Sequence, residues 1–215
     1  MKEKFNTYWN SKDEKLQRSD YIVLGILVLL YACLSFINLG STTNPNTFFK
    51  VTEDNNSLMF KMGEQAKEVA YMRLFVGENF GTYTIYTSMD DINYEYLKDI
   101  ELKSVFIWQD VEIDKEFKYL KIVGETPDSY LGEIQFYNFY YEKIMNVGYN
   151  DNSKYVLDEP DTVPEEISYL NSAYFDEVYF ARTAYDYANG IKAYEWVHPP
   201  LGKIIQMIPI KLMGM

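Results

Sequence analysis

Two neighbouring stretches decide the fold: VAYMRLFVG, from Val69 to Gly77, and GTYTIYTS, from Gly81 to Ser88. Both are rich in β-branched and aromatic residues, and each ends at a turn residue. Successive side chains of a strand point to opposite faces, so the first stretch is predicted to divide into two faces. Those faces are Tyr71, Arg73 and Phe75 on one side and Met72, Leu74 and Val76 on the other.

Four further runs have the same character. They are SLMFKMG, SVFIW, FKYLKIVG and GEIQFYNFYY, which occupy residues 57–63, 104–108, 117–124 and 132–141. Short strands at regular spacing with local alternation are typical of antiparallel sheets packed face to face. The sequence therefore predicts an antiparallel β-sandwich over residues 41–141.

The order of these runs, beginning with PNTFF at residue 45, resembles the discoidin or galactose-binding-like jelly roll. The resemblance covers most of residues 44–139, with Ser88 to Asp90 as the turn after a central strand and Gly132 to Ile134 in the closing strand. It implies a domain that binds sugars or lipid head groups through its loop tips. Tyr94, Tyr96 and Trp108 are candidates for such contacts. The alternative is that these aromatic residues fill the core or support a spacer.

A stretch of 19 residues without a charge, YIVLGILVLLYACLSFINL, runs from Tyr21 to Leu39. As a helix it would be about 28 Å long, close to the hydrocarbon thickness of a bilayer. We expect a transmembrane helix over residues 21–39, with a buried core helix as one alternative. The other is a cleaved signal or lipoprotein sequence, because basic residues precede the run and LYAC (Leu30 to Cys33) resembles a cleavage box.

Composition narrows the remaining possibilities. The 215 residues carry a net charge of −12, which argues against nucleic acid as a partner. A single Cys forbids an intramolecular disulfide, and one Cys with one His cannot form a zinc site, so we expect no bound metal. Within residues 1–20 there are five Lys and Arg. These place the amino terminus in the cytoplasm and residues 41–215 outside the cell membrane.

Beyond the sandwich we expect a linker over residues 142–172 and then a helical segment over residues 173–215. A helix is predicted from Tyr174 to Asn189, with Gly190 just after its end and Val178, Ala181, Tyr185 and Ala188 on one face. The run HPPLGK, His198 to Lys203, then opens an apolar helix. That helix is too short to span a bilayer and suits the membrane surface.

The segment FDEVYFARTAYDYANGIKAYEWVHPPLGK, residues 175–203, resembles the first outer loop of protein O-mannosyltransferases and their bacterial relatives. These are GT-C glycosyltransferases that use polyprenyl-phosphate sugars. The resemblance implies an Asp-Glu pair at Asp176 and Glu177, followed by an HPPLGK-type run from His198 to Lys203. It also implies transfer of a sugar, with mannose expected, to a protein Ser or Thr hydroxyl or another glycan acceptor, with no cofactor. Such enzymes continue through many membrane helices, so we expect the chain to be an amino-terminal portion that is inactive alone.

The chemistry of these residue types agrees with that resemblance. A carboxylate can take the proton of an attacking hydroxyl, which makes Asp176 the candidate base in an inverting transfer, with Glu177 orienting the acceptor or Asp176. His198 and Lys203 would contact the donor phosphate or anchor the loop. Alternatively, Asp176 and Glu177 only stabilise the start of a helix, and His198 only stabilises a turn. The alternative function is a non-catalytic, membrane-anchored carbohydrate-binding or interaction module.

The topology gives the first testable prediction. Protease added to intact cells or spheroplasts should remove the sandwich, because the basic residues precede the uncharged span and stay inside. The measurement is an immunoblot against the sandwich before and after the membrane is opened. Protection of residues 41–141 until the membrane is opened would show that the orientation is reversed.

Overall fold

The computed structural model of the chain describes residues 17–35, 37 and 43–213. Contacts between Cα atoms divide the chain into two compact units, residues 1–39 and residues 40–215. The first unit contains helix α2, and the second contains the β-strands and the remaining helices. Each unit is described by itself.

Helix α2 (Arg18–Ser35) has no charged side chain on any face from Tyr21 onward. It begins where the Asp20 carboxylate accepts a hydrogen bond from the backbone N–H of Gln17, at 2.7 Å, and none of its side chains is buried. Among the described residues it is the one helix long and apolar enough to cross a membrane, a test that signal sequences near an amino terminus also pass. Residues 36, 38 and 39 of the predicted span, and residues 1–16 of the segment before it, lie outside the described residues.

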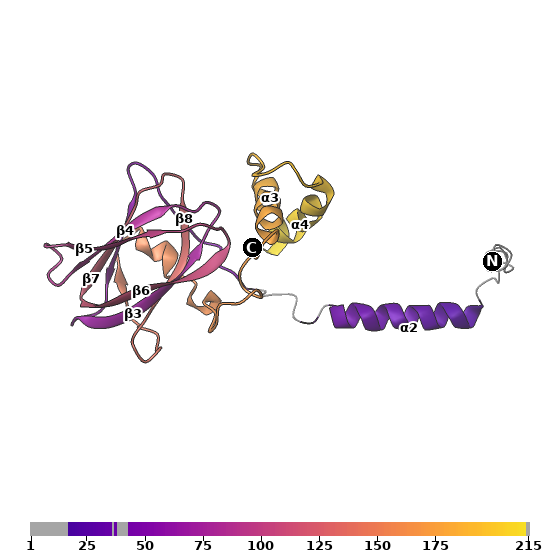
Figure 1. The fold of residues 1–215 in the computed structure, drawn as a ribbon, viewed down its shortest axis with the longest axis horizontal. Helices are drawn as coiled ribbons and strands as arrows, with labels where there is room; N and C mark the ends of the chain where they lie inside the picture. The colour runs from indigo at the N-terminus through magenta and orange to yellow at the C-terminus, as the bar shows by residue number, and fades with distance from the viewer. Residues whose placement is uncertain (1–16, 36, 38–42, 214–215) are drawn as a thin grey trace, which may run out of the picture. The chain divides into compact units, whose positions relative to one another are not determined.

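The second unit contains the predicted antiparallel sandwich (Figure 1). One sheet has four strands in the order β1-β8-β3-β6, and the other has five in the order β5-β4-β7-β2-β9. All recorded strand pairs are antiparallel. The strands are β1 (Phe49–Lys50), β2 (Ser57–Lys61), β3 (Lys67–Val76), β4 (Thr82–Ser88), β5 (Glu95–Glu101), β6 (Ile107–Phe117), β7 (Tyr119–Gly124), β8 (Tyr130–Tyr137) and β9 (Gly148–Tyr149).

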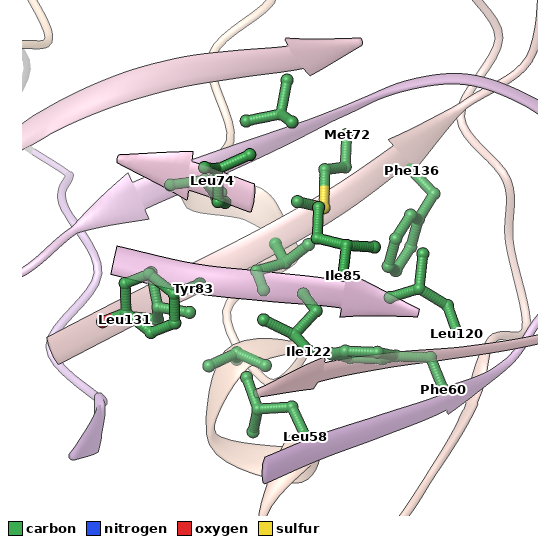
Figure 2. Close-up of a cluster of buried hydrophobic side chains, with 14 of the residues drawn as sticks. Leu58, Phe60, Met72, Leu74, Tyr83, Ile85, Leu120, Ile122, Leu131 and Phe136 are labelled. Atoms are coloured by element: carbon green, nitrogen blue, oxygen red, sulfur yellow. The ribbon is translucent and has the colours of Figure 1, made fainter. Parts of the chain in front are cut away.

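The core lies between the two sheets. From the four-stranded sheet come Met72, Leu74, Leu131 and Phe136, and they meet side chains of β2, β4 and β7 in the other sheet (Figure 2). The rings of Phe60 and Phe136 meet edge to face across the two layers, with centroids 5.3 Å apart. Each fully buried side chain of this size stabilises the fold by about 1.5–3 kcal/mol. Leu58, Phe60, Tyr83, Ile85, Leu120 and Ile122 are the labelled members from the five-stranded sheet.

The alternation predicted for residues 71–76 is confirmed. Met72, Leu74 and Val76 belong to the core between the sheets. On the opposite face, Phe75 belongs to a second buried cluster and Arg73 is 6% exposed. Strand β3 therefore buries side chains on both of its faces. The segments that cover its outer face are needed to keep Arg73 and Phe75 out of water.

The bounds of two predicted strands differ most from the observed ones. The run SVFIW was expected to be extended from Ser104, but Phe106 has a φ of 54° and strand β6 begins at Ile107. The run from Gly132 was expected to reach Tyr141, but β8 ends at Tyr137 and a turn follows. Strand β5 was missed because its sequence, EYLKDIE, is too polar to be read as half buried.

The segment expected as a linker, residues 142–172, lies against the sandwich. Ile144 and Val156 are buried in the core between the sheets, and the segment contains strand β9 and the two 3₁₀ helices η1 (Ser153–Val156) and η2 (Pro160–Thr162). The backbone carbonyls of Pro164 and Glu165 accept hydrogen bonds from the Arg73 guanidinium, at 2.7 and 2.9 Å. These contacts cover the outer face of β3.

Arg73 also forms a two-pronged ion pair with Asp110 of β6, with N–O distances of 2.7 and 2.8 Å. Its guanidinium lies 5.5 Å from the ring centre of Tyr137, which stacks on Tyr71 with centroids 4.6 Å apart. A buried guanidinium needs all of these partners, because an unpaired buried charge is costly. Arg73 therefore holds residues 164–165 to the four-stranded sheet.

A second polar contact joins the same segment to the sheet. The Glu133 carboxylate, on β8, accepts a hydrogen bond from the backbone N–H of Glu159 at 3.0 Å. The carboxylate of Glu159 in turn accepts hydrogen bonds from the backbone N–H groups of Asn46 and Thr47, at 2.7 and 2.9 Å. Burial, together with the nearby charges of Asp158 and Glu159, raises the pKa of Glu133 to about 7.

This raised pKa predicts a pH dependence of stability. Because the pKa of Glu133 in the fold is above its ordinary value of 4.5, the folded protein keeps this carboxyl protonated at pH 5 and must ionise it at pH 8. The contribution of Glu133 to the free energy of unfolding is therefore lost as pH rises from about 4.5 to 7. At pH 8, Glu133→Gln should raise the free energy of unfolding by up to roughly 3 kcal/mol and so raise the thermal unfolding midpoint. At pH 5 it should leave the midpoint unchanged. Circular dichroism melts in detergent at the two pH values measure this effect. The exposed Glu53→Gln is the control, and equal gains at both pH values would contradict the assignment.

Candidate functional site

The predicted site residues lie on two helices, α3 (Glu177–Asn189) and α4 (Pro200–Met213). Helix α3 ends as predicted at Gly190, whose φ of 68° is the left-handed conformation that glycine adopts without strain. Helix α4 begins within the HPPLGK run, since proline fits the first turn of a helix, where its missing N–H leaves no bond unmade. The two helices pack against each other.

Helix α3 is anchored on the outer face of the four-stranded sheet. Of the face predicted from the sequence, Val178, Ala181 and Tyr185 pack against a buried cluster that includes Phe75 and Trp108, whereas Ala188 lies outside that cluster. Just before the helix, the N–H of Ala173 donates to the carbonyl of Phe106 at 2.9 Å, and the hydroxyl of Ser172 accepts from the N–H of Trp108 at 3.0 Å. The sandwich thereby fixes the start of α3.

Polar contacts hold the connection between α3 and α4. Arg182 bonds through its guanidinium to the Asn79 side chain, and it lies 4.3 Å from the ring centre of Tyr194. The carboxylate of Asp186 accepts a hydrogen bond from the N–H of Tyr194 at 2.7 Å. Burial raises the pKa of Asp186 above its usual range. Two residues of α3 therefore hold Tyr194, Arg182 through its ring and Asp186 through its backbone N–H.

Asp176 and Glu177 stand at the first turn of α3, where both are exposed. The Asp176 side chain makes no capping hydrogen bond, and its backbone is already helical, with φ −67° and ψ −18°. The carboxylate of Glu177 instead accepts the backbone N–H of Tyr174 at 3.0 Å, which is the return contact of a helix cap. Of the two residues, Glu177 is therefore the one whose side chain stabilises the start of the helix by a hydrogen bond.

His198 and Lys203 are brought together by a residue that the sequence analysis did not single out. One oxygen of the Glu195 carboxylate lies 3.1 Å from Nδ1 of His198 and is also bonded to the ammonium of Lys203. The other oxygen accepts the backbone N–H groups of Val197 and His198, at 2.7 and 3.3 Å. The side chain of Lys203 is 1% exposed and that of Glu195 is 12% exposed. The carboxylate therefore binds the HPPLGK run at its first and last residues.

Aromatic rings of α3 complete this arrangement. Phe180 lies against His198, with ring centroids 5.2 Å apart, and the Lys203 ammonium is 5.7 Å from the Phe180 ring centre. Tyr179 stacks near His198 at 6.1 Å. The His198–Lys203 turn is thereby held against the helix that begins with Asp176 and Glu177.

The bond to Lys203 lowers the pKa of Glu195 to about 2, and the backbone and His198 contacts act in the same direction. A depressed carboxyl pKa contributes stability that is complete above the ordinary value of 4.5 and is lost as pH falls toward 2. At neutral pH the carboxylate is charged and the turn is intact. Sequence reasoning missed Glu195 because its role follows from the burial of Lys203, which is visible only in the structure.

The three aromatic residues proposed for the loop tips differ in their burial and contacts. Trp108 is 3% exposed and belongs to the buried cluster under α3, so the core interpretation is the right one for it. The Tyr94 hydroxyl donates to the Asp91 carboxylate at 2.6 Å. Tyr96 is 59% exposed on strand β5, with its ring edge-on to Tyr86. Among the described residues, no three His, Cys, Asp or Glu side chains gather as metal ligands would.

Of three comparisons with known proteins, the one with solved structures found matches. No family model matches the sequence. No curated protein matches it either. Among solved structures, CBM32-1 from a family 31 glycoside hydrolase of Clostridium perfringens is 19% identical, with a TM-score of 0.34, over 38% of this chain and 68% of that one.

Two more solved structures are similar to the same extent. CpGH89CBM32-6 produced by Clostridium perfringens is 18% identical, with a TM-score of 0.39, over 47% of this chain and 82% of that one. The C-terminal domain of a chitobiase from Bacteroides fragilis is 13% identical, with a TM-score of 0.37, over 43% of this chain and 73% of that one. No activity of this chain follows from likenesses this partial.

The contacts of Glu195 give a prediction for the helix pair. Glu195→Gln should leave the buried Lys203 ammonium without its counter-charge, so amides of α4 should exchange with deuterium faster, by about tenfold or more. Mass spectrometry of peptides from residues 200–213 measures this rate. Adding Lys203→Met to the same chain should restore part of the protection, since the unpaired charge is then gone.

The exposed Glu166→Gln is the matched control and should leave exchange in α4 unchanged. Wild-type exchange for Glu195→Gln would mean that this carboxylate does not hold the turn.

Proposed function

We propose that the chain is the amino-terminal portion of an integral-membrane glycosyltransferase, which transfers a sugar from a polyprenyl-phosphate carrier to an acceptor hydroxyl. The sugar we propose is mannose, and the acceptor is a protein Ser or Thr. In this proposal the amino terminus is cytoplasmic, α2 spans the cell membrane, and residues 41–215 lie outside it. Downstream membrane helices would supply the cavity for the lipid donor.

The state of Asp176 is the observation that carries this proposal. Its carboxylate is exposed and caps no helix N–H, although it stands at a helix start where capping is the ordinary role of an aspartate. Its neighbour Glu177 takes the capping contact instead. A carboxylate held on a rigid helix start and left out of the cap is suited to accept a proton from a substrate.

The proposed reaction uses Asp176 as general base. It takes the proton of the acceptor hydroxyl as that oxygen attacks the anomeric carbon, and the configuration at that carbon inverts. The bond to the lipid phosphate breaks, and the phosphate leaves as an anion that needs no protonation. Glu177, bonded to the backbone at Tyr174, would orient the acceptor or Asp176.

The contacts of His198 and Lys203 favour different roles for the two residues. Lys203 is buried and paired with Glu195, which supports the anchoring role that the sequence left open for it. The side chain of His198 is 36% exposed and uses Nδ1 toward Glu195, so Nε2 is the ring atom left for the donor phosphate. In this proposal Glu195 acts as a positioning residue for His198.

The surface of α4 supports its place at the membrane. Apolar side chains three and four positions apart stay exposed along one side of the helix, and Trp196 and Val197 just before it are 72% and 89% exposed. Such a face is typical of helices that lie in the lipid headgroup region. The exposed side chains of α4 are Leu201, Ile204, Ile205, Ile208 and Leu212.

The catalytic prediction concerns Asp176. In membranes that contain the complete enzyme, Asp176→Asn should lower sugar transfer from a polyprenyl-phosphate donor by about 10²–10⁴, because the amide keeps the shape and loses the basicity. Thermal stability should stay the same, since no capping bond is lost. Glu177→Gln should cost less, because an amide oxygen can still accept the N–H of Tyr174.

The exposed Asp151→Asn, at equal expression, serves as the matched control. Activity of Asp176→Asn within a few-fold of wild type would remove the general-base assignment.

A further inference from the structure

A pocket of about 360 Å³ lies next to the residue proposed as base, and the proposed reaction gives it no role. Its lining comes from residues 104, 107 and 108, at the start of β6, and from residues 167–178. Its volume is within the range of ligand sites. Phe175 belongs to the lining and Asp176 is the next residue of the chain, so a ligand in this pocket would lie beside the Asp176 carboxylate.

Exposed aromatic side chains form the rim of the pocket. Tyr169, Tyr174 and Phe175 belong to its lining and are 75%, 72% and 77% exposed. Ile107 and Val178, which are partly buried, make the lining beneath them mainly apolar. Large aromatic side chains that the fold leaves in water around an apolar pocket are typical of sites that bind a partner.

The backbone of Phe175 is strained. Its φ of 51° lies in the left-handed region, which is uncommon for a large side chain. The ring stays exposed, so its burial does not repay this strain. Strain of this kind persists mainly at functional sites. The conformation of Phe175 therefore indicates a role for its ring other than folding.

The rim is held in place before any ligand binds. The Asn171 side chain accepts the backbone N–H of Ser168 at 3.0 Å and donates to the carbonyl of Glu166 at 2.7 Å. These bonds close the turn that carries Tyr169, and the bonds of residues 172 and 173 to β6 fix the chain just before Tyr174. A pocket formed in advance binds with little loss of conformational entropy.

The wall of the pocket contains a hydrogen-bond donor without a partner. Trp108 belongs to the lining, and its indole N–H is buried with no hydrogen bond to any residue that the structure describes. An unpaired buried donor is unfavourable. A carbonyl oxygen of a bound chain would pair with it, whereas the hydrocarbon tail of a lipid would not. The pocket therefore fits a polypeptide better than a lipid.

The charge around the pocket selects among polypeptides. Four exposed carboxylates stand directly before and after its aromatic segment, and Lys103, beside residue 104, is already paired with Glu101 at 3.2 Å. This negative charge disfavours phosphates and acidic segments and attracts basic ones. The carboxylates belong to Glu165, Glu166, Asp176 and Glu177.

We propose that this pocket binds a large apolar side chain of the acceptor polypeptide, with basic residues of the same polypeptide near the four carboxylates. This inference rests on the proposed function, because it assigns acceptor selection to a pocket beside the proposed base. Adjacent Cα atoms such as those of Phe175 and Asp176 are about 3.8 Å apart, and an extended chain advances about 3.3 Å per residue. The Ser or Thr that receives the sugar would then stand about one to three residues from the apolar one. The sandwich, through Ile107 and Trp108, would help to select the hydroxyl that is modified.

The test measures peptide binding by the full chain in detergent, with no sugar donor present. The probe is a fluorescein-labelled peptide with one Thr, a Phe two positions before it and a Lys at each end, and the measurement is fluorescence anisotropy. The same peptide with Gly in place of the Phe should bind about tenfold more weakly or worse, because the buried ring is lost. The peptide with Glu in place of each Lys should bind about threefold more weakly or worse.

Phe175→Gly separates binding from folding. It removes the exposed ring, and glycine adopts a φ of 51° without strain, so the melting temperature should stay near the wild-type value. Binding of the Phe peptide should fall about tenfold or more. Tyr140→Ala is the matched control, since it removes an aromatic side chain that is 83% exposed and does not line this pocket. It should bind as wild type does.

Three results would overturn the proposal: no binding of the Phe peptide, equal binding of the Phe peptide and either substituted peptide, or wild-type binding by Phe175→Gly. The assay contains no donor, so its outcome does not depend on Asp176 acting as base. Loss of sugar transfer in Asp176→Asn without any peptide binding would remove this inference and leave the proposed function standing. Peptide binding with an active Asp176→Asn would remove the base assignment alone.

Discussion

The fold of residues 43–213 depends on burying both faces of strand β3. Its inner face supplies Met72, Leu74 and Val76 to the core between the sheets. Its outer face presents a cation and a large ring, Arg73 and Phe75, which a two-layer sandwich alone would leave in water. Because burial of an unpaired guanidinium is costly, the outer face needs carbonyl and carboxylate partners as well as apolar cover. Residues 142–189 supply that cover.

The cover connects the sandwich to the proposed catalytic segment. The carbonyls of Pro164 and Glu165 satisfy Arg73, and a short distance along the chain Val178 packs onto the cluster that contains Phe75. The start of α3 is therefore fixed by a β-strand more than 90 residues earlier in the sequence. The interactions that stabilise the sandwich are also the ones that place Asp176. Docking of this kind is stronger than helix propensity alone, since short helices are marginal in water.

The sequence patterns correctly predicted those features of the fold that depend on neighbouring residues alone. The alternation in β3, the end of α3 at Gly190 and three of the four predicted face residues of α3 follow from side-chain period and backbone freedom, and they are as expected. Strand β5 was missed because an edge strand with charged residues lacks the alternation of a half-buried one. The cover by residues 142–172 was missed because its polar composition is that of a linker. Its polar contacts depend on residues far away in the sequence, such as Arg73 and Glu133, which no local window contains.

The candidate site shows the same division between local and long-range information. The sequence placed Asp176, Glu177, His198 and Lys203, but it did not show that the helix cap uses Glu177 or that Lys203 is buried. Both facts depend on how a third group is placed, the N–H of Tyr174 in one case and the carboxylate of Glu195 in the other. Lys203 is neutralised by Glu195, and one oxygen of Glu177 is bonded to the backbone, so Asp176 and His198 are the motif side chains best suited to direct contact with the reacting groups. A base and a phosphate contact are the two functions that the proposed transfer requires of them.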